Sequence, residues 1–400
     1  MRRASLNVGL LLLSANLISA AQISKTRSNA DLLHKAAQAI TAGKLDQAED
    51  SLQTVLRSAP KEYRALDLLG VVRVLQKREV EADKLFRRAV QANSDFAPAH
   101  AHLGLLDAQR GQSQEAVPQL REALRLDPSR SDASAALVNA LQDQAGVAAT
   151  AGESEKALAL LIDARKYAPE NSDVQFQLGV IALQMSLWQD AVDAFQQTLK
   201  LRVNDSLAVY DLGRASVGLA KFEDARAQFV RYIELRPDDS AGYCALGMTL
   251  AALQRSAEAR TQFERSVALA PAQIESYYRL GLLDLDSNDW DAASRNLRQV
   301  LDREPKHAGA LTALGRAEFE QKHYTEATDL LQRAIANDES SREAHYYLGL
   351  SFARLGRKQE SEAQLQIAMQ LEHDEAGRRR TVFRIVDPTP SDAQGATSQK

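Results

Sequence analysis

The sequence is poor in the residue types that most often carry chemistry or charge-driven binding. Its 400 residues include one cysteine, two tryptophans and seven histidines, and Phe, Trp and Tyr together make up 6%. A single cysteine excludes an intrachain disulfide framework and a cluster of thiolate metal ligands. The 49 Lys and Arg residues against 53 Asp and Glu residues give a net charge of −4. This balance lacks the basic excess of a general nucleic-acid binder, so no nucleic-acid partner is expected.

Long apolar runs are also missing, except for one short stretch at the start. The segment Leu6–Ile18 follows two arginines and precedes small residues ending at Ala21. This order predicts a signal peptide over residues 1–21, and therefore an exported protein, periplasmic or secreted, without stable membrane insertion after cleavage. The alternative is an uncleaved anchor, although Asn7 and Asn16 interrupt a stretch that is already shorter than the roughly 20 apolar residues of a spanning helix.

What the sequence does contain is a repeat of 34 residues. Leu-Gly pairs recur at this interval, apart from one gap of 75, and their glycines are Gly70, Gly104, Gly179, Gly213, Gly247, Gly281, Gly315 and Gly349. Twelve residues after each of these glycines stands an alanine or serine, and four residues later a large apolar residue. Six of the ten prolines fall in one column at the repeat ends. The prolines therefore punctuate repeats.

Each repeat is predicted to contain two helices. Between the turn signals, apolar residues are spaced by three or four, which is typical of amphipathic helices. A glycine inside the first helix costs about 1 kcal/mol relative to alanine. That cost is tolerable where two helices approach closely, and the small residue in the second helix serves the same contact. The sequence therefore predicts an all-α fold.

These columns resemble the tetratricopeptide repeat family, whose unit is a helix–turn–helix of 34 residues. The resemblance covers ten units, or 347 of the 400 residues, and implies an all-α solenoid of the alpha-alpha superhelix type. A short leader, residues 22–28, precedes the solenoid (29–375), and a tail that is predicted to be mostly disordered, residues 376–400, follows it. The predicted units are 29–62, 63–96, 97–130, 131–171, 172–205, 206–239, 240–273, 274–307, 308–341 and 342–375.

The fourth unit carries seven additional residues, which is about two helical turns. An insertion of this length keeps the apolar face of a helix in phase, so one longer first helix is the favoured prediction. The alternative is a helix of normal length followed by a long loop broken at Gly146.

The resemblance also implies a concave groove lined by the first helices, with positions two, five, nine and twelve of each pointing into it. Positions five and nine of the fifth to tenth units are largely aromatic and apolar, with two arginines, a composition suited to protein recognition. The alternative is that several of these side chains only pack between neighbouring first helices. The candidate partner-binding residues are Phe176, Tyr210, Arg214, Cys244, Met248, Tyr278, Leu282, Arg316 and Tyr346.

No motif in the sequence indicates catalysis. His100 and His102 are two residues apart and do not share a helix face, and the glycines are periodic and structural. We therefore expect no enzyme activity, no cofactor and no metal. The predicted function is an exported, non-enzymatic scaffold that binds a protein or peptide segment in the groove. The alternative is an accessory subunit of an envelope polysaccharide, outer-membrane biogenesis or secretion machine that acts through an enzyme partner.

The tail contains one apolar run, Thr381–Val386, after three arginines. Two interpretations remain open for it. It covers the exposed end of the last repeat, which a solenoid must shield or solvate, or it is a docking peptide for a partner.

Overall fold

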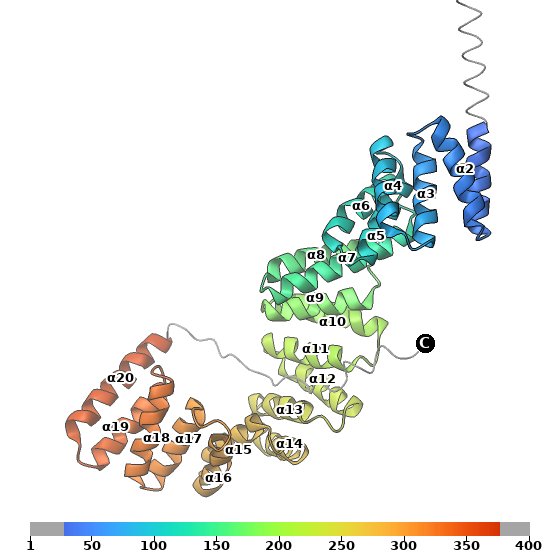
Figure 1. Cartoon of the computed structure of the whole chain (residues 1–400). Helices are drawn as coiled ribbons and strands as arrows, with labels where there is room; N and C mark the ends of the chain where they lie inside the picture. The colour runs from blue at the N-terminus through green and yellow to red at the C-terminus, as the bar shows by residue number, and fades with distance from the viewer. Residues whose placement is uncertain (1–27, 377–400) are drawn as a thin grey trace, which may run out of the picture. The chain divides into compact units, whose positions relative to one another are not determined.

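The computed structural model describes the backbone of residues 28–376, and all regular structure in this part of the chain is helical (Figure 1). The predicted signal peptide and the run Thr381–Val386 lie outside the described residues. A first helix covers residues 28–41. The helices that follow are α2 (Leu45–Ser58), α3 (Tyr63–Leu75), α4 (Glu79–Ala92), α5 (Ala97–Gln109), α6 (Ser113–Leu126), α7 (Ser131–Thr150), α8 (Ser154–Tyr167), α9 (Ser172–Gln184), α10 (Trp188–Leu201), α11 (Ser206–Gly218), α12 (Phe222–Leu235), α13 (Ser240–Ala252), α14 (Ser256–Leu269), α15 (Ile274–Asp286), α16 (Trp290–Leu301), α17 (Ala308–Glu320), α18 (Tyr324–Asn337), α19 (Arg342–Arg354) and α20 (Lys358–Ala376).

The helices form consecutive hairpins, which confirms the predicted all-α fold class. Within each hairpin a turn of about three residues joins the first helix to the second, and one turn residue has a positive φ. Glycine takes this place at Gly43, Gly111, Gly152 and Gly356, with φ between 70° and 79°. This bears out the prediction that these glycines lie between paired helices. Six other turns place a residue with a side chain in the same left-handed region: Lys77, Ser186, Ala220, Gln254, Asn288 and Lys322.

The two helices of a hairpin touch at the conserved-spacing glycine of the first helix. A Cβ atom added to Gly213 would lie only 2.7 Å from the ring of Phe229, sixteen residues later in the second helix. Ala225, the small residue between them in sequence, is fully buried. A larger residue at position 213 would therefore have to push the two helices apart, and this close contact confirms the role predicted for the glycine column.

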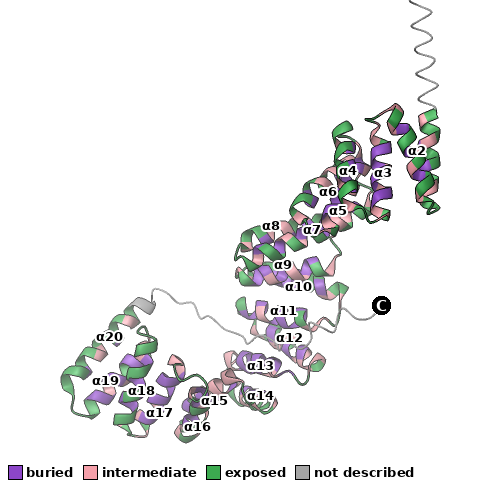
Figure 2. Cartoon of the chain, viewed as in Figure 1, coloured by how far each residue is buried: buried purple, intermediate pink, exposed green. Residues whose placement is uncertain are grey.

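The chain divides into two compact units, one up to Val174 and one from Gln175, and each is described by itself. In both units a second helix packs against its own first helix and against the next first helix. Successive first helices also contact each other, as α3, α5 and α7 do in the first unit and α13, α15, α17 and α19 do in the second. Buried residues gather where the helices face one another, and outward faces are exposed (Figure 2).

The irregular fourth repeat contains a lengthened first helix. Helix α7 has 20 residues, seven more than the 13 of α5. The prediction of one longer helix is confirmed, and Gly146 lies within it. Seven residues extend a helix by about 10 Å. Among the described residues, none of the helices offers an apolar stretch long enough to cross a lipid bilayer.

Candidate protein-binding face

The nine candidate residues all lie on first helices of the second unit, but the structure divides them by burial. Helices α9, α11, α13, α15, α17 and α19 carry them. Tyr210 and Cys244 are 0% exposed and Met248 is 2% exposed. The sequence analysis placed these three side chains in a groove, whereas the structure places them in the core. For them, the alternative of packing between helices describes the structure.

Aromatic stacking accounts for the burial of Tyr210. Its ring lies 5.4 Å from that of Phe229 and 4.8 Å from that of Tyr232, both on α12. The hydroxyl of Tyr232 donates a hydrogen bond of 2.6 Å to the Asp239 carboxylate. Burial raises the pKa of Tyr210 well above its usual range, so its phenol stays neutral. The group is a packed, hydrogen-bonded layer of the core.

Cys244 is a neutral thiol in the same cluster. Burial raises its pKa to about 11, although hydrogen bonds with Ser276 and Gln273 act in the opposite direction. A thiol with this pKa is protonated near neutral pH and is a poor nucleophile. Cys244 therefore acts here as a small hydrophobic residue, in agreement with the sequence interpretation.

Phe176 and Arg214 are partly accessible at the other end of the second unit. The ring of Phe176 packs edge-on against Phe195 at 5.7 Å. The guanidinium of Arg214 donates to the carboxylate of Asp211 at 3.0 Å, and its side chain is 32% exposed. Each has a local structural partner as well as exposed surface.

The last three repeats present the accessible candidates together. We use the name C-terminal aromatic face for Tyr278, Arg316, Tyr346 and Tyr347 on α15, α17 and α19. The ring of Tyr278 lies 4.9 Å from that of His307, at the start of the next repeat. Its hydroxyl would be 2.6 Å from a Cβ atom at position 309, which is glycine. Gly309 thus leaves room for Tyr278 to extend from α15 over α17.

Arg316 and Tyr346 continue this face. A guanidinium nitrogen of Arg316 lies 3.4 Å from the carboxylate of Glu343, and the guanidinium lies 5.8 Å from the centre of the Tyr347 ring. Tyr346 packs edge-on against Tyr347 at 5.3 Å and is 43% exposed. Leu282 is half-buried beside the same core cluster. The structure thus brings aromatic rings and one arginine together along three first helices that contact in sequence.

Glu343 and Tyr347 were missed because only positions five and nine of the first helices were carried over from the sequence. Glu343 occupies position two of its repeat and Tyr347 position six. Extending the comparison to position two, which the resemblance also implied, would have found Glu343. Nothing in the repeat register indicates Tyr347.

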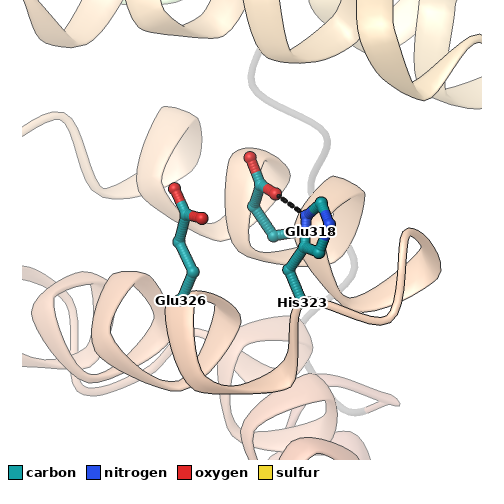
Figure 3. A group of neighbouring side chains, drawn as sticks. All are labelled: Glu318, His323 and Glu326. Carbon is teal, nitrogen blue, oxygen red and sulfur yellow. Dashed lines mark hydrogen bonds and ion pairs between the residues drawn. The ribbon is translucent and has the colours of Figure 1, made fainter.

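One cluster of metal-ligating residue types lies outside this face. Ligand atoms of Glu318, His323 and Glu326 all lie within 4.8 Å of one another, at the turn between α17 and α18 (Figure 3). The Nδ1 atom of His323 lies 2.8 Å from the buried carboxylate of Glu318. The sequence analysis missed the group because its members are spread over a helix, a turn and a second helix.

The protein already supplies a cation to this cluster. A guanidinium nitrogen of Arg298, on α16, lies 2.9 Å from Glu318 and 3.3 Å from Glu326. The charge of Arg298 matches the buried Glu318 carboxylate, which would otherwise be unpaired. A metal ion would have to displace this guanidinium, so the cluster is best described as an ion-pair network that joins two repeats.

Stacked helical hairpins with an accessible aromatic face define the class of helical-repeat solenoid proteins. Models of the family described as Tetratricopeptide repeat match residues 35–98, 143–205, 210–274, 278–342 and 323–371, and a further one matches 97–130. These matches cover well over half of the sequence. The chain therefore belongs to the tetratricopeptide repeat family.

Several individual proteins are similar to parts or most of this chain. The type IV pilus assembly protein PilF of Pseudomonas aeruginosa is 28% identical over a region that covers 37% of this chain and 68% of PilF. The structure of the APC/C hetero-tetramer Cut9–Hcn1 is 13% identical, covering 85% of this chain and 93% of that chain, with a TM-score of 0.46. YrrB, described as a repeat protein with an unusual peptide-binding site, is 19% identical, covering 48% and 95%, with a TM-score of 0.39.

Proposed function

We propose that this protein is a non-enzymatic scaffold that binds a protein segment on the C-terminal aromatic face. The observation that carries the proposal is the joint accessibility of Tyr346 and Arg316 on neighbouring first helices. Aromatic rings and arginine are the side chains that dominate the binding energy of protein interfaces. Exposed aromatic surface with no catalytic group beside it favours recognition over chemistry.

The pairing of Arg316 leaves it available to a partner. Its contact with Glu343 is long, at 3.4 Å, and the side chain of Glu343 is 48% exposed. An exposed ion pair contributes less than about 1 kcal/mol. A partner carboxylate can therefore take the place of Glu343 at little cost, while an apolar side chain of the same segment packs against Tyr346.

Site-specific photo-crosslinking tests this function in the source organism. A photoreactive phenylalanine analogue at Tyr346 is expected to capture one or a few proteins, and the charge reversal Arg316→Glu is expected to reduce their yield at least fivefold. The same analogue at Tyr167, an exposed tyrosine at the end of α8 in the first unit, is the matched control. Identical products at both positions, or products insensitive to Arg316→Glu, would contradict the proposal.

We further propose that the scaffold works in the cell envelope, as part of an assembly or secretion machine. The predicted signal peptide over residues 1–21 supports export, and the similarity to a type IV pilus assembly protein supports this setting. Fractionation of cells that carry an epitope-tagged chain tests export. Recovery of the tag in the cytoplasm with residues 1–21 still attached would sink this second proposal, and would leave the binding face untouched.

A further inference from the structure

The lengthened helix α7 creates a pocket in the first unit. It has a volume of about 550 Å³ and lies between the turn that joins α5 to α6 and the last turns of α7 (Figure 1). Residues 111–115 form one side of it, and Asp143, Val147 and Ala151 of the α7 segment form the other. This pocket shares no residue with the C-terminal aromatic face, and the inference drawn from it does not depend on the proposed function.

The origin of the pocket is the seven-residue insertion. A regular first helix ends level with the turn of the preceding repeat, as its 13 residues match those of its neighbour. Helix α7 continues for about 10 Å further. Its last two turns, together with the start of α8, therefore stand beyond the α5–α6 turn and leave a notch that no neighbouring repeat fills.

The wall that α7 contributes is apolar and uncovered. Val147 is 69% exposed, the largest exposed fraction of any bulky apolar side chain in the part of the chain that the structure describes. Ala148 and Ala151 line the pocket beside it. A regular amphipathic helix keeps valine on its packed face, so an exposed valine in a pocket marks surface that a ligand can cover.

The rim of the pocket is acidic. Glu115, Asp143 and Glu153 contribute three carboxylates, against one ammonium group from Lys156. Lys156 is engaged by Glu153 at 2.7 Å. Asp143 accepts only a long hydrogen bond, 3.3 Å, from the Ser113 hydroxyl. The pocket therefore combines an aliphatic wall with a surplus of two negative charges.

The pocket shape itself is fixed by a short hydrogen bond between its two sides. The side-chain amide of Gln144 on α7 donates to the backbone carbonyl of Ser113 at 2.6 Å. This bond ties the overhanging part of α7 to the α5–α6 turn. A preformed pocket binds its ligand without paying to order its own walls.

We propose that this notch is a second docking site, which takes a peptide segment carrying a lysine or arginine next to an aliphatic side chain. The aliphatic group covers Val147, and the basic group pairs with Glu115 and Asp143. Charge complementarity selects a basic segment, because an acidic one would meet three carboxylates at the rim.

Selection from a random heptapeptide library displayed on phage, with the full chain immobilised, tests the proposal. Peptides whose binding is unchanged by Tyr346→Ala are kept, which removes ligands of the C-terminal aromatic face. We expect the remainder to be enriched in Lys or Arg beside Leu, Ile, Val or Met. A fluorescein-labelled consensus peptide then gives Kd by fluorescence anisotropy.

Matched variants locate the bound peptide. Val147→Ser is expected to raise Kd at least fivefold, while Val80→Ser, which changes a 68% exposed valine on α4, leaves it within twofold. The double variant Glu115→Gln/Asp143→Asn is expected to raise Kd at least fivefold and to weaken the salt dependence of binding. Neutralising two exposed carboxylates outside the pocket, Glu155→Gln/Glu170→Gln, leaves Kd within twofold.

Two results would overturn the proposal. One is a selection that yields no peptides enriched in basic residues. The other is a consensus peptide whose Kd responds equally to the pocket variants and to their controls. Circular dichroism melting of each variant confirms that a loss of binding is not a loss of folding, since all four substitutions change exposed side chains.

Discussion

Two regions of the second unit use the same repeat register for different ends. In the repeats of α11 to α14, the first-helix residues Tyr210, Cys244 and Met248 are closed into the core. In the repeats of α15 to α20, the matching face carries Tyr278 and Tyr346, which keep accessible surface. The comparison teaches that a position in the repeat does not by itself make a residue part of a binding surface.

The difference between the regions has a local cause on α12. Tyr232 occupies a column that in most repeats is small, as at Ala89, Ser266 and Ala334. The facing first helix compensates with Gly242, where a Cβ atom would lie 2.7 Å from the Tyr232 ring. This large-for-small exchange brings the Tyr232 ring against Tyr210 and closes that face.

The largest expected effect separates the two regions by stability. Tyr210→Ala removes a fully buried ring that stacks on two others, so we expect a loss of about 3–5 kcal/mol in the free energy of unfolding. Tyr346→Ala, at an exposed ring, is expected to cost less than about 1 kcal/mol. Urea denaturation of both variants in the full chain measures the difference. Equal losses would remove the distinction between a closed and an open region.

The second prediction concerns access to thiols. Cys244 is buried and its pKa is raised to about 11, so alkylation by iodoacetamide at pH 7.5 is expected to be at least 100-fold slower than for a free thiol. A cysteine placed at the open face, Tyr346→Cys in a Cys244→Ala background, is expected to react close to the free rate. Mass spectrometry over time gives both rates. Fast labelling of native Cys244 would mean that the closed face opens readily.

The sequence predicted the helix pairs well and the face poorly, for physical reasons. Contacts such as Gly213 against Phe229 repeat every 34 residues and are visible as columns. The choice between a long helix and a loop in the fourth repeat followed from helical phase. Burial of Tyr210, by contrast, depends on the single exchange of Tyr232 and Gly242, which the repeat average conceals. Departures from a column are therefore as informative as the column.

The third prediction uses pH to probe the closed region. The pKa of Cys244 is raised from 9.0 to about 11, so its thiol ionises in the unfolded chain first. Between these values the unfolded state binds fewer protons than the folded state, and stability falls as pH rises. This thiol should contribute a loss of about 1–2 kcal/mol between pH 9 and 11. The tyrosines also titrate in this range, so the difference between the native chain and Cys244→Ala is the quantity to measure by urea denaturation. The two pH profiles should run parallel only if the thiol is accessible to solvent.

The smallest expected effect tests whether the comparison extends beyond the faces to the hairpins themselves. Ala220, in the turn of a closed repeat, and Lys322, in the turn of an open one, both have positive φ, at 56° and 69°. A left-handed residue with a Cβ atom costs about 1 kcal/mol or more, which glycine avoids. Part of that gain is lost to the greater entropy of glycine in the unfolded chain. Ala220→Gly and Lys322→Gly are each expected to stabilise the chain by about 0.5 kcal/mol, seen as a small rise in the urea midpoint. Equal gains would show that both regions are built from the same hairpin and differ only in what covers its first helix. A gain confined to one turn would instead trace the difference to the hairpin backbone.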